Sequence, residues 1–204
     1  MKNFILVSLA LALIFSGISQ TNHRTYNNPE IGLSFNYPVT WKILSKTGLK
    51  DSIDRASKKG IIPEETAKIK TEVIPSIVFS LSKPRKVDGK NRNTSINVIV
   101  MEIPEKELAL FNLNTVAEKQ KADIKAAIKG SETSENAPPL HGYPEVSNYT
   151  VKATIRDYDF TQHHYLYLYG PYFVQIALSY SHQDDEAEII KIIESIKVKN
   201  AASD

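Results

Sequence analysis

Apolar and polar residues alternate most regularly between Gln162 and Ser181, where the sequence predicts a β-hairpin. The first run alternates leucines with tyrosines, and the second carries aliphatic residues at every other position. These residues are Leu166 and Leu168 between Tyr165, Tyr167 and Tyr169, then Val174, Ile176 and Leu178. Gly170-Pro171 separates the runs as a turn signal. Such alternation is typical of half-buried antiparallel strands. We therefore expect one face to pack on a core and the other to carry tyrosines with hydrated hydroxyls.

Shorter runs predict further strands. Residues 31–37 alternate, and Pro38 ends the run because proline has no N–H for a ladder. Residues 73–81 predict a strand, and residues 95–103, apolar on both faces, predict a central strand covered on both sides. Residues 146–160 predict one long strand before the hairpin. Trp41, the single tryptophan, is interpreted as a core residue, with ligand stacking as the alternative.

Apolar residues spaced by three and four positions predict helices over 49–59, 63–72, 115–130 and from Asp184 to about Ile196. For the third helix, Thr115 and Glu118 match a capping box, and Lys121 is among the lysines expected on its outer face. Residues 21–30 predict a polar leader, residues 131–139 a loop and residues 197–204 a frayed tail. This order of elements favours an α+β fold with an antiparallel β-sheet of about six or seven strands sandwiched between helices.

The first nineteen residues match a secretory signal peptide. Lys2 precedes an apolar run from Phe4 to Phe15, and small residues follow it. The run is shorter than the roughly 20 residues of a membrane span. We expect cleavage after Ser19 and a single domain over residues 20–204, in the periplasm or secreted. The alternative is an uncleaved N-terminal anchor. The chain has no cysteine, which excludes a lipobox, disulfides and thiol chemistry.

The overall charge points to no bulk electrostatic partner. The chain has 25 Lys and Arg against 23 Asp and Glu, so the mature part without Lys2 carries 24 − 23 = +1. This balance gives no argument for nucleic acid or a membrane surface. A binding role must therefore be sought in local clusters.

The most polar segment, Ser82 to Thr94, predicts a long hairpin loop with five basic residues and one acidic residue. The basic residues are Lys83, Arg85, Lys86, Lys90 and Arg92. This basic loop is a candidate binding site for an acidic protein, a phospholipid head group or an anionic cell-wall polymer, and the alternative is a solvated hairpin tip. The tyrosine face of Tyr165, Tyr167 and Tyr169 is a second candidate binding surface, unless a helix covers it.

A third cluster could bind a divalent metal. Asp157 and Asp159 lie two residues apart, and His163 and His164 are expected just past the next turn. Carboxylate and imidazole are ligands for transition metals. Adjacent histidines on a strand point to opposite faces, however, so joint ligation by both is not expected. The alternative is a solvated strand end, and no cofactor is expected.

Catalytic motifs have little support. The sequence has no G-x-S-x-G, no H-E-x-x-H and no glycine-rich phosphate loop. Ser80 to Lys83 spells S-x-x-K, but it falls on a predicted strand end rather than at the start of a helix. We therefore do not expect an enzyme.

Several short motifs together resemble a known family. Gly32 to Pro38 followed by Trp41 spells G-L-S-F-N-Y-P-x-x-W, and Leu140 to Pro144 spells L-H-G-Y-P after the amphipathic helix. A strand, a hairpin ending in Ser179-Tyr180-Ser181 and a closing helix complete the order. This pattern resembles the PsbP-like superfamily, which includes the extrinsic PsbP subunit of photosystem II and bacterial envelope proteins of the DcrB type. The resemblance implies an antiparallel sheet between helix layers, roles in binding and assembly, and no catalytic residues.

The resulting hypothesis is a non-enzymatic, secreted or periplasmic binding or assembly module. Its partner would be an unknown envelope protein or an anionic envelope component. The alternative is an envelope metal-binding protein or enzyme that uses Asp157, Asp159 and a histidine.

Overall fold

The computed structural model describes residues 22–58, 76–83, 86–87, 90–91, 94–140, 143, 145–155 and 158–199. The expected signal peptide, the helix predicted over 63–72, and Arg85, Arg92 and Asp157 lie outside the described residues. No helix of the described part is long and apolar enough to cross a membrane.

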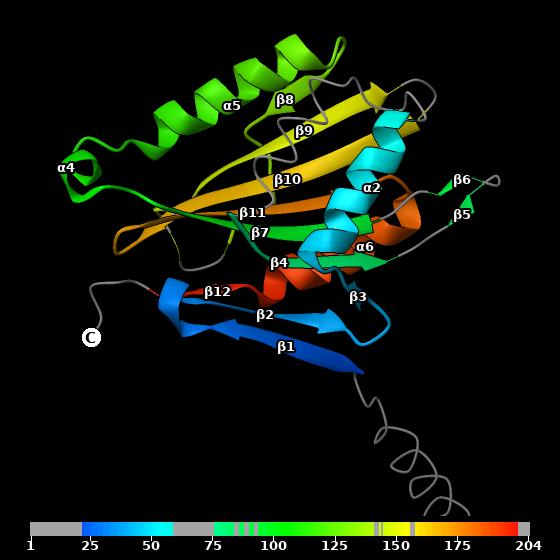
Figure 1. Ribbon diagram of the computed structural model, residues 1–204, viewed down its shortest axis with the longest axis horizontal. Coiled ribbons are helices and arrows are strands. Elements are labelled where there is room, and N and C mark those ends of the chain that lie inside the picture. Colours follow the sequence, from blue (N-terminus) through cyan, green and yellow to red (C-terminus); the bar gives the residue numbers. More distant parts are fainter. Residues whose placement is uncertain are drawn as a thin grey trace, which may run out of the picture.

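The centre of the fold is a seven-stranded antiparallel sheet (Figure 1). Its order is β3-β4-β7-β11-β10-β9-β8, and each pair of neighbours runs antiparallel. The strands are β3 (Lys42–Ile43), β4 (Ile77–Lys83), β7 (Thr94–Glu102), β8 (Glu132–Ser134), β9 (Ser147–Ile155), β10 (Tyr158–Tyr169) and β11 (Tyr172–Tyr180). The predicted hairpin is confirmed as β10 and β11, with Gly170 in the turn at a φ of 55°. Together with the helices described below, this antiparallel sheet confirms the predicted α+β class.

The single strand predicted over 146–160 is wrong. It is two strands, β9 and β10, which pair antiparallel with Ile155 opposite Tyr158. The chain therefore reverses between these two residues. No glycine or proline marks the reversal. Its signal in the sequence is a change of phase, because apolar residues stand at odd positions up to Ile155 and at even positions from Tyr158. The turn that was expected after Asp159 comes before it.

Helices α4 (Glu105–Leu108) and α5 (Leu113–Ala127) follow β7, and α5 covers one face of the sheet. Beneath them, Leu166 and Phe173 are fully buried with Tyr149 and Val151. The predicted capping box is wrong, because the N-cap is Asn112, whose side chain accepts from the Thr115 N–H. Lys121, expected outside, is only 9% exposed and pairs with Glu118 and Glu135.

The other face is covered by α6 (Gln183–Ser195) and a three-stranded sheet of order β1-β2-β12 (Figure 1). The small sheet contains β1 (His23–Asn28), β2 (Leu33–Pro38) and β12 (Lys197–Val198), and a 3₁₀ turn, η1 (Pro29–Ile31), links the first two. The polar leader predicted over residues 21–30 is therefore wrong at β1, and the frayed tail predicted over residues 197–204 is wrong at β12. These polar segments become strands because β2 supplies a ladder partner on each side. Trp41 is 3% exposed in the core between the layers, as its core interpretation predicts.

The tyrosine face of β10 is buried between the central sheet and this second layer. Tyr165 is 0% exposed and Tyr167 is 2% exposed, while Tyr169 is partly buried against the same core. Their hydroxyls are not hydrated as expected. That of Tyr165 donates to the Pro138 carbonyl at 2.7 Å, and that of Tyr167 to the Ile31 carbonyl at 3.0 Å. The two ends of the chain build the layer that buries these rings, and local alternation does not reveal such distant packing.

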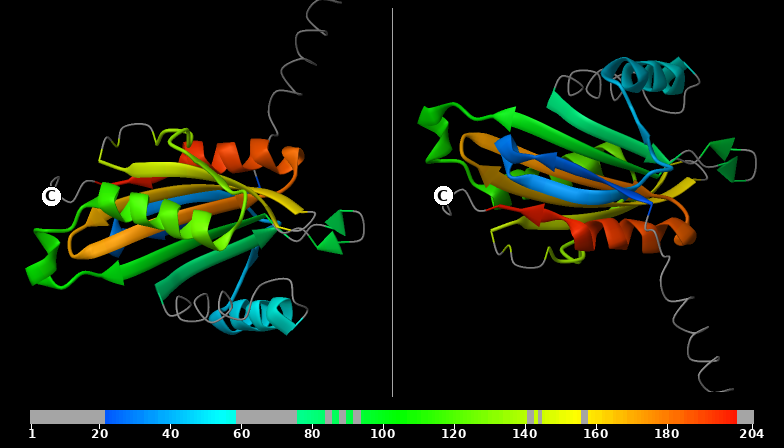
Figure 2. Two further views of the ribbon diagram at one scale, coloured as in Figure 1. Left: turned by 90° about the horizontal axis from the view of Figure 1, so that it is seen from above. Right: turned by 90° about the horizontal axis from the view of Figure 1, so that it is seen from below.

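Two elements complete the described fold. Helix α2 (Lys46–Lys58) confirms the first predicted helix. Strands β5 (Lys86–Val87) and β6 (Lys90–Asn91) lie between β4 and β7 in the sequence and form a separate two-stranded sheet. This small hairpin projects from one end of the central sheet in Figure 1 and in both views of Figure 2.

Candidate functional site

The projecting hairpin carries the basic loop identified in the sequence. Its four described residues form an antiparallel pair of strands, in which Lys86 pairs with Asn91 and Val87 pairs with Lys90. Residues 84–93 contain four basic residues and one acidic residue, a net charge of 4 − 1 = +3. This segment, which we call the basic hairpin, is far more charged than the nearly neutral mature chain.

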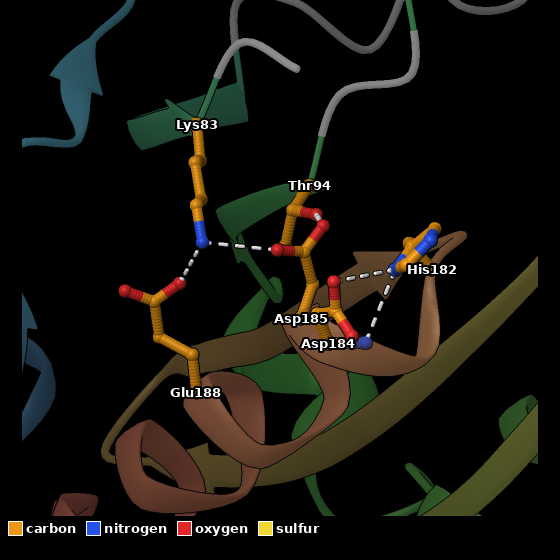
Figure 3. A network of polar contacts seen from close by, with 6 residues as sticks. All are labelled: Lys83, Thr94, His182, Asp184, Asp185 and Glu188. Atoms are coloured by element: carbon orange, nitrogen blue, oxygen red, sulfur yellow. Dashed lines mark hydrogen bonds and ion pairs between the residues drawn. The ribbon is translucent and has the colours of Figure 1, made fainter. Parts of the chain in front are cut away.

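The ends of the two strands that flank the basic hairpin are bound to helix α6 by one carboxylate (Figure 3). Lys83 ends β4, Thr94 begins β7, and the two residues are cross-strand partners. Asp185 accepts from Lys83 Nζ at 2.9 Å through Oδ1 and from Thr94 Oγ1 at 2.7 Å through Oδ2. Asp185 and Thr94 are both 0% exposed. A buried carboxylate thus uses one oxygen for each strand of the pair.

Lys83 has a second acidic partner, Glu188, one turn further along α6. Burial acts to lower the pKa of Lys83, but hydrogen bonds to Glu188 and Asp185 outweigh it, so the pKa lies above its ordinary value. Lys83 was grouped with the other basic residues as a candidate for partner binding. The structure instead places its ammonium group between two carboxylates of its own chain.

The first turn of α6 fixes the position of Asp185. His182 is the N-cap, and its Nδ1 accepts from the Asp184 N–H at 3.2 Å. The Asp185 N–H donates to the His182 carbonyl at 3.0 Å. Acidic residues in a first turn also suit the positive end of the helix dipole. The predicted start of this helix therefore supplies the anchor of the basic hairpin.

The residues of the metal hypothesis are not brought together. His163 and His164 point to opposite faces of β10, as expected, because His163 bonds Thr150 on the α6 side while His164 stacks on Tyr149 beneath α5. Asp159 bonds Thr154, and it lies four residues, about 13 Å, from His163 along the strand. Within the described residues, no group of three metal-ligating side chains is found.

His164 belongs instead to a hydrogen-bond chain under α5. Its Nδ1 accepts from the Gln175 amide at 2.9 Å, and its Nε2 donates to the Gln162 carbonyl oxygen at 2.8 Å. The amide groups define these roles, because an amide nitrogen only donates and an amide oxygen only accepts. Burial lowers the pKa of His164 to about 3, so the ring is neutral.

The same chain extends across the interface between the helix and the sheet. The Tyr149 hydroxyl donates to Gln120 at 2.7 Å, and the Gln120 amide donates to Gln175 at 3.1 Å. At the other end, the Gln162 amide donates to Ser179 at 2.6 Å. Every link donates in the same direction from Tyr149 to Ser179. This arrangement satisfies the buried Gln175 and the partly buried Gln120 and Gln162, and it positions α5 through Gln120, which is a structural role.

A polar hollow of about 460 Å³ lies beside the first turn of α6, over the ends of β8, β9 and β10. Its lining includes the carboxylates of Glu132, Asp159 and Glu186 and the ammonium group of Lys152. The Tyr180 hydroxyl donates to Glu186 at 2.9 Å, and burial together with this bond raises its pKa to about 12. Sequence reasoning missed the hollow because its lining comes from separate elements with no common spacing.

Comparisons with known proteins give neighbours in fold only. No protein-family model and no curated protein matches the sequence. Solved structures similar to this chain include a cyanobacterial PsbP (CyanoP) from Synechocystis, with a TM-score of 0.48 and 13% identity over 90% of this chain and 96% of that chain.

Two further structures are similar at the same level. LpqN, involved in cell envelope biogenesis of Mycobacterium tuberculosis, has a TM-score of 0.48 and 12% identity over 92% of this chain and 97% of that one. The immunity protein TplEi of Pseudomonas aeruginosa, complexed with a peptide, has a TM-score of 0.45 and 9% identity over 88% and 99%. At these scores the likeness supports no argument about activity or partner.

Proposed function

We propose that this chain is an exported, non-enzymatic binding module whose basic hairpin recognises an acidic surface of an envelope protein. One observation carries the proposal. The two residues that flank the hairpin, Lys83 at the end of β4 and Thr94 at the start of β7, are both bonded by one buried carboxylate. A solvated hairpin tip has no need of such an anchor, whereas a recognition element gains affinity when it is held in place before binding.

The composition of the basic hairpin favours a protein partner over a bilayer. Elements that insert at membrane interfaces carry Trp, Phe or Leu. Residues 84–93 contain none of these, and Val87 is the only large aliphatic residue among them. The charge of Lys86, Lys90 and the two arginines suits carboxylate groups, which arginine binds in bidentate fashion.

Other features support a binding role in the envelope. Residues 1–19 match a signal peptide that we propose is cleaved after Ser19, which leaves residues 20–204 as one domain. Both ring nitrogens of His164 are already bonded to glutamines, so this histidine supports packing rather than chemistry.

The test uses the mature chain, residues 20–204, and a variant with Arg85→Gln, Lys86→Gln, Lys90→Gln and Arg92→Gln. Lys83 is left unchanged because its ammonium group pairs with the buried Asp185. A matched control replaces four exposed lysines elsewhere, Lys106, Lys119, Lys125 and Lys129, by Gln. The first probe is a labelled peptide of alternating Glu and Gly, and the second is captured protein from the native envelope, identified by mass spectrometry.

We expect the wild type and the control to bind the acidic peptide and to capture the same envelope protein through an acidic region. The hairpin variant should lose both, and salt near 0.5 M should weaken binding by the wild type because it screens the charges. Equal capture by all three proteins would overturn the proposal. Vesicles of phosphatidylcholine with 30% phosphatidylglycerol form the third arm. Binding to these vesicles without binding to the peptide or a protein would assign the hairpin to lipid instead.

A further inference from the structure

The floor of the polar hollow is a row of side chains that crosses four strands of the central sheet. Its members are cross-strand partners on β8, β9, β10 and β11 in turn, and all of them line the hollow: Glu132, Lys152, Thr161 and Tyr180. Directly opposite residues of antiparallel strands point to the same face of a sheet. Because the Tyr180 hydroxyl bonds Glu186 on α6, the whole row points to the face that α6 covers.

The rest of the lining consists mainly of neighbouring polar groups. One row nearer to the reversal between β9 and β10, Thr154 pairs with Asp159, and its hydroxyl donates to that carboxylate. The start of α6 forms a wall with His182, Gln183 and Glu186. The hollow of about 460 Å³ is therefore bounded by groups from four strands and one helix, all of them among the described residues.

Unpaired buried polar atoms gather around the hollow. Among the described residues, four buried side-chain atoms have no hydrogen-bond partner, and three of them are Ser131 Oγ, His163 Nε2 and Ser181 Oγ. Ser181 lines the hollow, and Ser131 stands in the sequence between two residues that line it. A buried polar atom without a partner is costly, so several at one place need an explanation. Their concentration here indicates a site that is built to receive polar groups.

His163 brings one of these atoms to the inner end of the hollow. It lies two residues after Thr161 on the same face of β10, and it is only 5% exposed. Its Nδ1 bonds Thr150 Oγ1 on β9 at 2.9 Å, and the two nitrogens of an imidazole point to nearly opposite sides of the ring. Nε2 is therefore directed to the other side of β10, where the centre of the Tyr180 ring lies 5.7 Å from that of His163.

The charges of the lining favour a cation. Three carboxylates face one ammonium group, that of Lys152, so the formal charge with histidine neutral is 1 − 3 = −2. Asp159 accepts from Thr154 through Oδ1, and Glu186 accepts from Tyr180 through Oε1, which leaves the second oxygen of each carboxylate for a ligand. A concave site lined mostly by one sign of charge concentrates ligands of the opposite sign.

We propose that the polar hollow binds the primary ammonium group of a small polar molecule, such as an amino sugar or a diamine. Asp159 and Glu186 accept hydrogen bonds from the ammonium group, and Ser181 Oγ is in place to bond a further polar atom of the ligand. The volume lies within the range of small-molecule sites, roughly 300–1,000 Å³. This site contains no residue of the basic hairpin, so the inference does not rest on the proposed function.

The test follows ligand titrations of the mature chain by NMR near pH 6.5, where amines are protonated. Glucosamine and putrescine carry primary ammonium groups, while N-acetylglucosamine has the same sugar ring as glucosamine without the charge. The signals to follow are the amides of Thr161, Ser181 and Gln183 on the lining and the ring of His163 beneath it.

Three variants change the charge of the lining. Asp159→Asn and Glu186→Gln remove one negative charge each but keep an oxygen that can accept from Thr154 or Tyr180, and Lys152→Gln removes the positive charge. The matched controls, Glu194→Gln and Lys191→Gln, change exposed residues of α6 outside the lining.

We expect glucosamine, putrescine or both to bind with a Kd of roughly 1 mM, the strength typical of so small a ligand. N-acetylglucosamine should bind at least about tenfold more weakly. Asp159→Asn and Glu186→Gln should each weaken binding about threefold to fivefold, Lys152→Gln should strengthen it by a similar factor, and the controls should bind as the wild type does. Effects of opposite sign separate recognition of charge from damage to the fold, which would weaken binding in every variant.

Binding of glucosamine alone would assign the site to amino sugars, and binding of putrescine alone would assign it to diamines. Binding of both would show that the ammonium group is sufficient. No change of signals with either compound at about 20 mM, or equal binding of N-acetylglucosamine and glucosamine, would overturn the inference. Calcium chloride is the last arm. Tighter binding of Ca²⁺ than of either amine, with the same signals affected, would assign the hollow to a metal ion and would likewise overturn it.

Discussion

The aromatic ring of Tyr169 lies against the α-carbon of Gly32. A β-carbon at Gly32 would come within 2.4 Å of Tyr169 Cε2 and 2.7 Å of Cδ2. Gly32 also has a φ of 62°, the left-handed conformation that ends η1 and begins β2. Its carbonyl accepts from the Lys199 N–H at 2.8 Å. Gly32 therefore contacts both Lys199 and the β10–β11 hairpin at the start of strand β2.

Replacing Gly32 by alanine should strongly destabilise the fold. The left-handed conformation alone costs about 1–2 kcal/mol for an L-residue, and overpacking against Tyr169 adds about 1–3 kcal/mol. Urea unfolding measures the change in the free energy of unfolding. Gly130→Ala is the control, since Gly130 has a φ of 80° but a β-carbon there would meet no atom of the described residues within 4 Å. Equal losses for both variants would show that the ring contact has no effect.

Local sequence patterns predicted those parts of the fold that depend on near neighbours. The β10–β11 hairpin, β2, α5 and α6 follow from alternation, helical spacing and turn residues within each segment. The second layer did not follow, because β1 and β12 are polar segments that form strands only beside β2. The burial of Tyr165 and Tyr167 depends on that layer and was missed with it.

The candidate site could likewise be predicted only where its residues are neighbours in the sequence. A run of basic residues is visible over residues 83–92, and the sequence marks it as the most polar segment. The role of Lys83 was not visible, because its partner Asp185 lies 102 residues away. Ion pairs between distant residues leave no periodic signal. The two histidines were likewise interpreted as possible ligands, because the glutamines that bond His164 lie on two different strands and form no motif with it.

The N-terminal cap of α5 can be tested with a pair of single variants. Asn112→Ala should lower the free energy of unfolding by about 1 kcal/mol, since the Asn112 carbonyl oxygen accepts from the Thr115 N–H at 3.0 Å. Thr115→Ala should have little effect, because the exposed Thr115 is not the cap. Thermal and urea unfolding of both variants make the comparison. A larger loss for Thr115→Ala would restore the capping box that the sequence predicts.

The ion pair between Lys83 and the buried Asp185 predicts non-additive effects of substitution. Lys83→Met removes an ion-pair partner of the buried Asp185 carboxylate, so the free energy of unfolding should fall by about 1–3 kcal/mol, less than for a fully buried pair because Lys83 is 31% exposed. Lys83→Met combined with Asp185→Asn should lose less than the sum of the two single variants. A double-mutant cycle by urea unfolding measures this coupling. Strictly additive losses would mean that the two groups do not interact.

The neutral state of His164 predicts how stability changes with pH. Its pKa is about 3 in the folded chain and about 6.5 in the unfolded chain, so between these values only the unfolded chain binds the proton. The free energy of unfolding should therefore be constant above pH 6.5 as far as His164 is concerned. It should then fall by about 1.4 kcal/mol for each pH unit below that value. Burial also lowers the pKa of His163, which steepens the fall in the same direction.

Urea unfolding at pH 7.5, 6.5 and 5.5 separates this contribution from those of acidic groups, which titrate lower. His164→Gln removes the titrating ring, so its stability should depend less on pH over this range although it is lower at every pH. His23→Gln is the control, because His23 is exposed on β1. In the wild type, the ring signals of His164 should not titrate by NMR between pH 8 and 5. A ring that titrates near pH 6.5 in the folded chain would contradict the neutral, glutamine-bonded histidine, and with it the directional hydrogen-bond chain that positions α5.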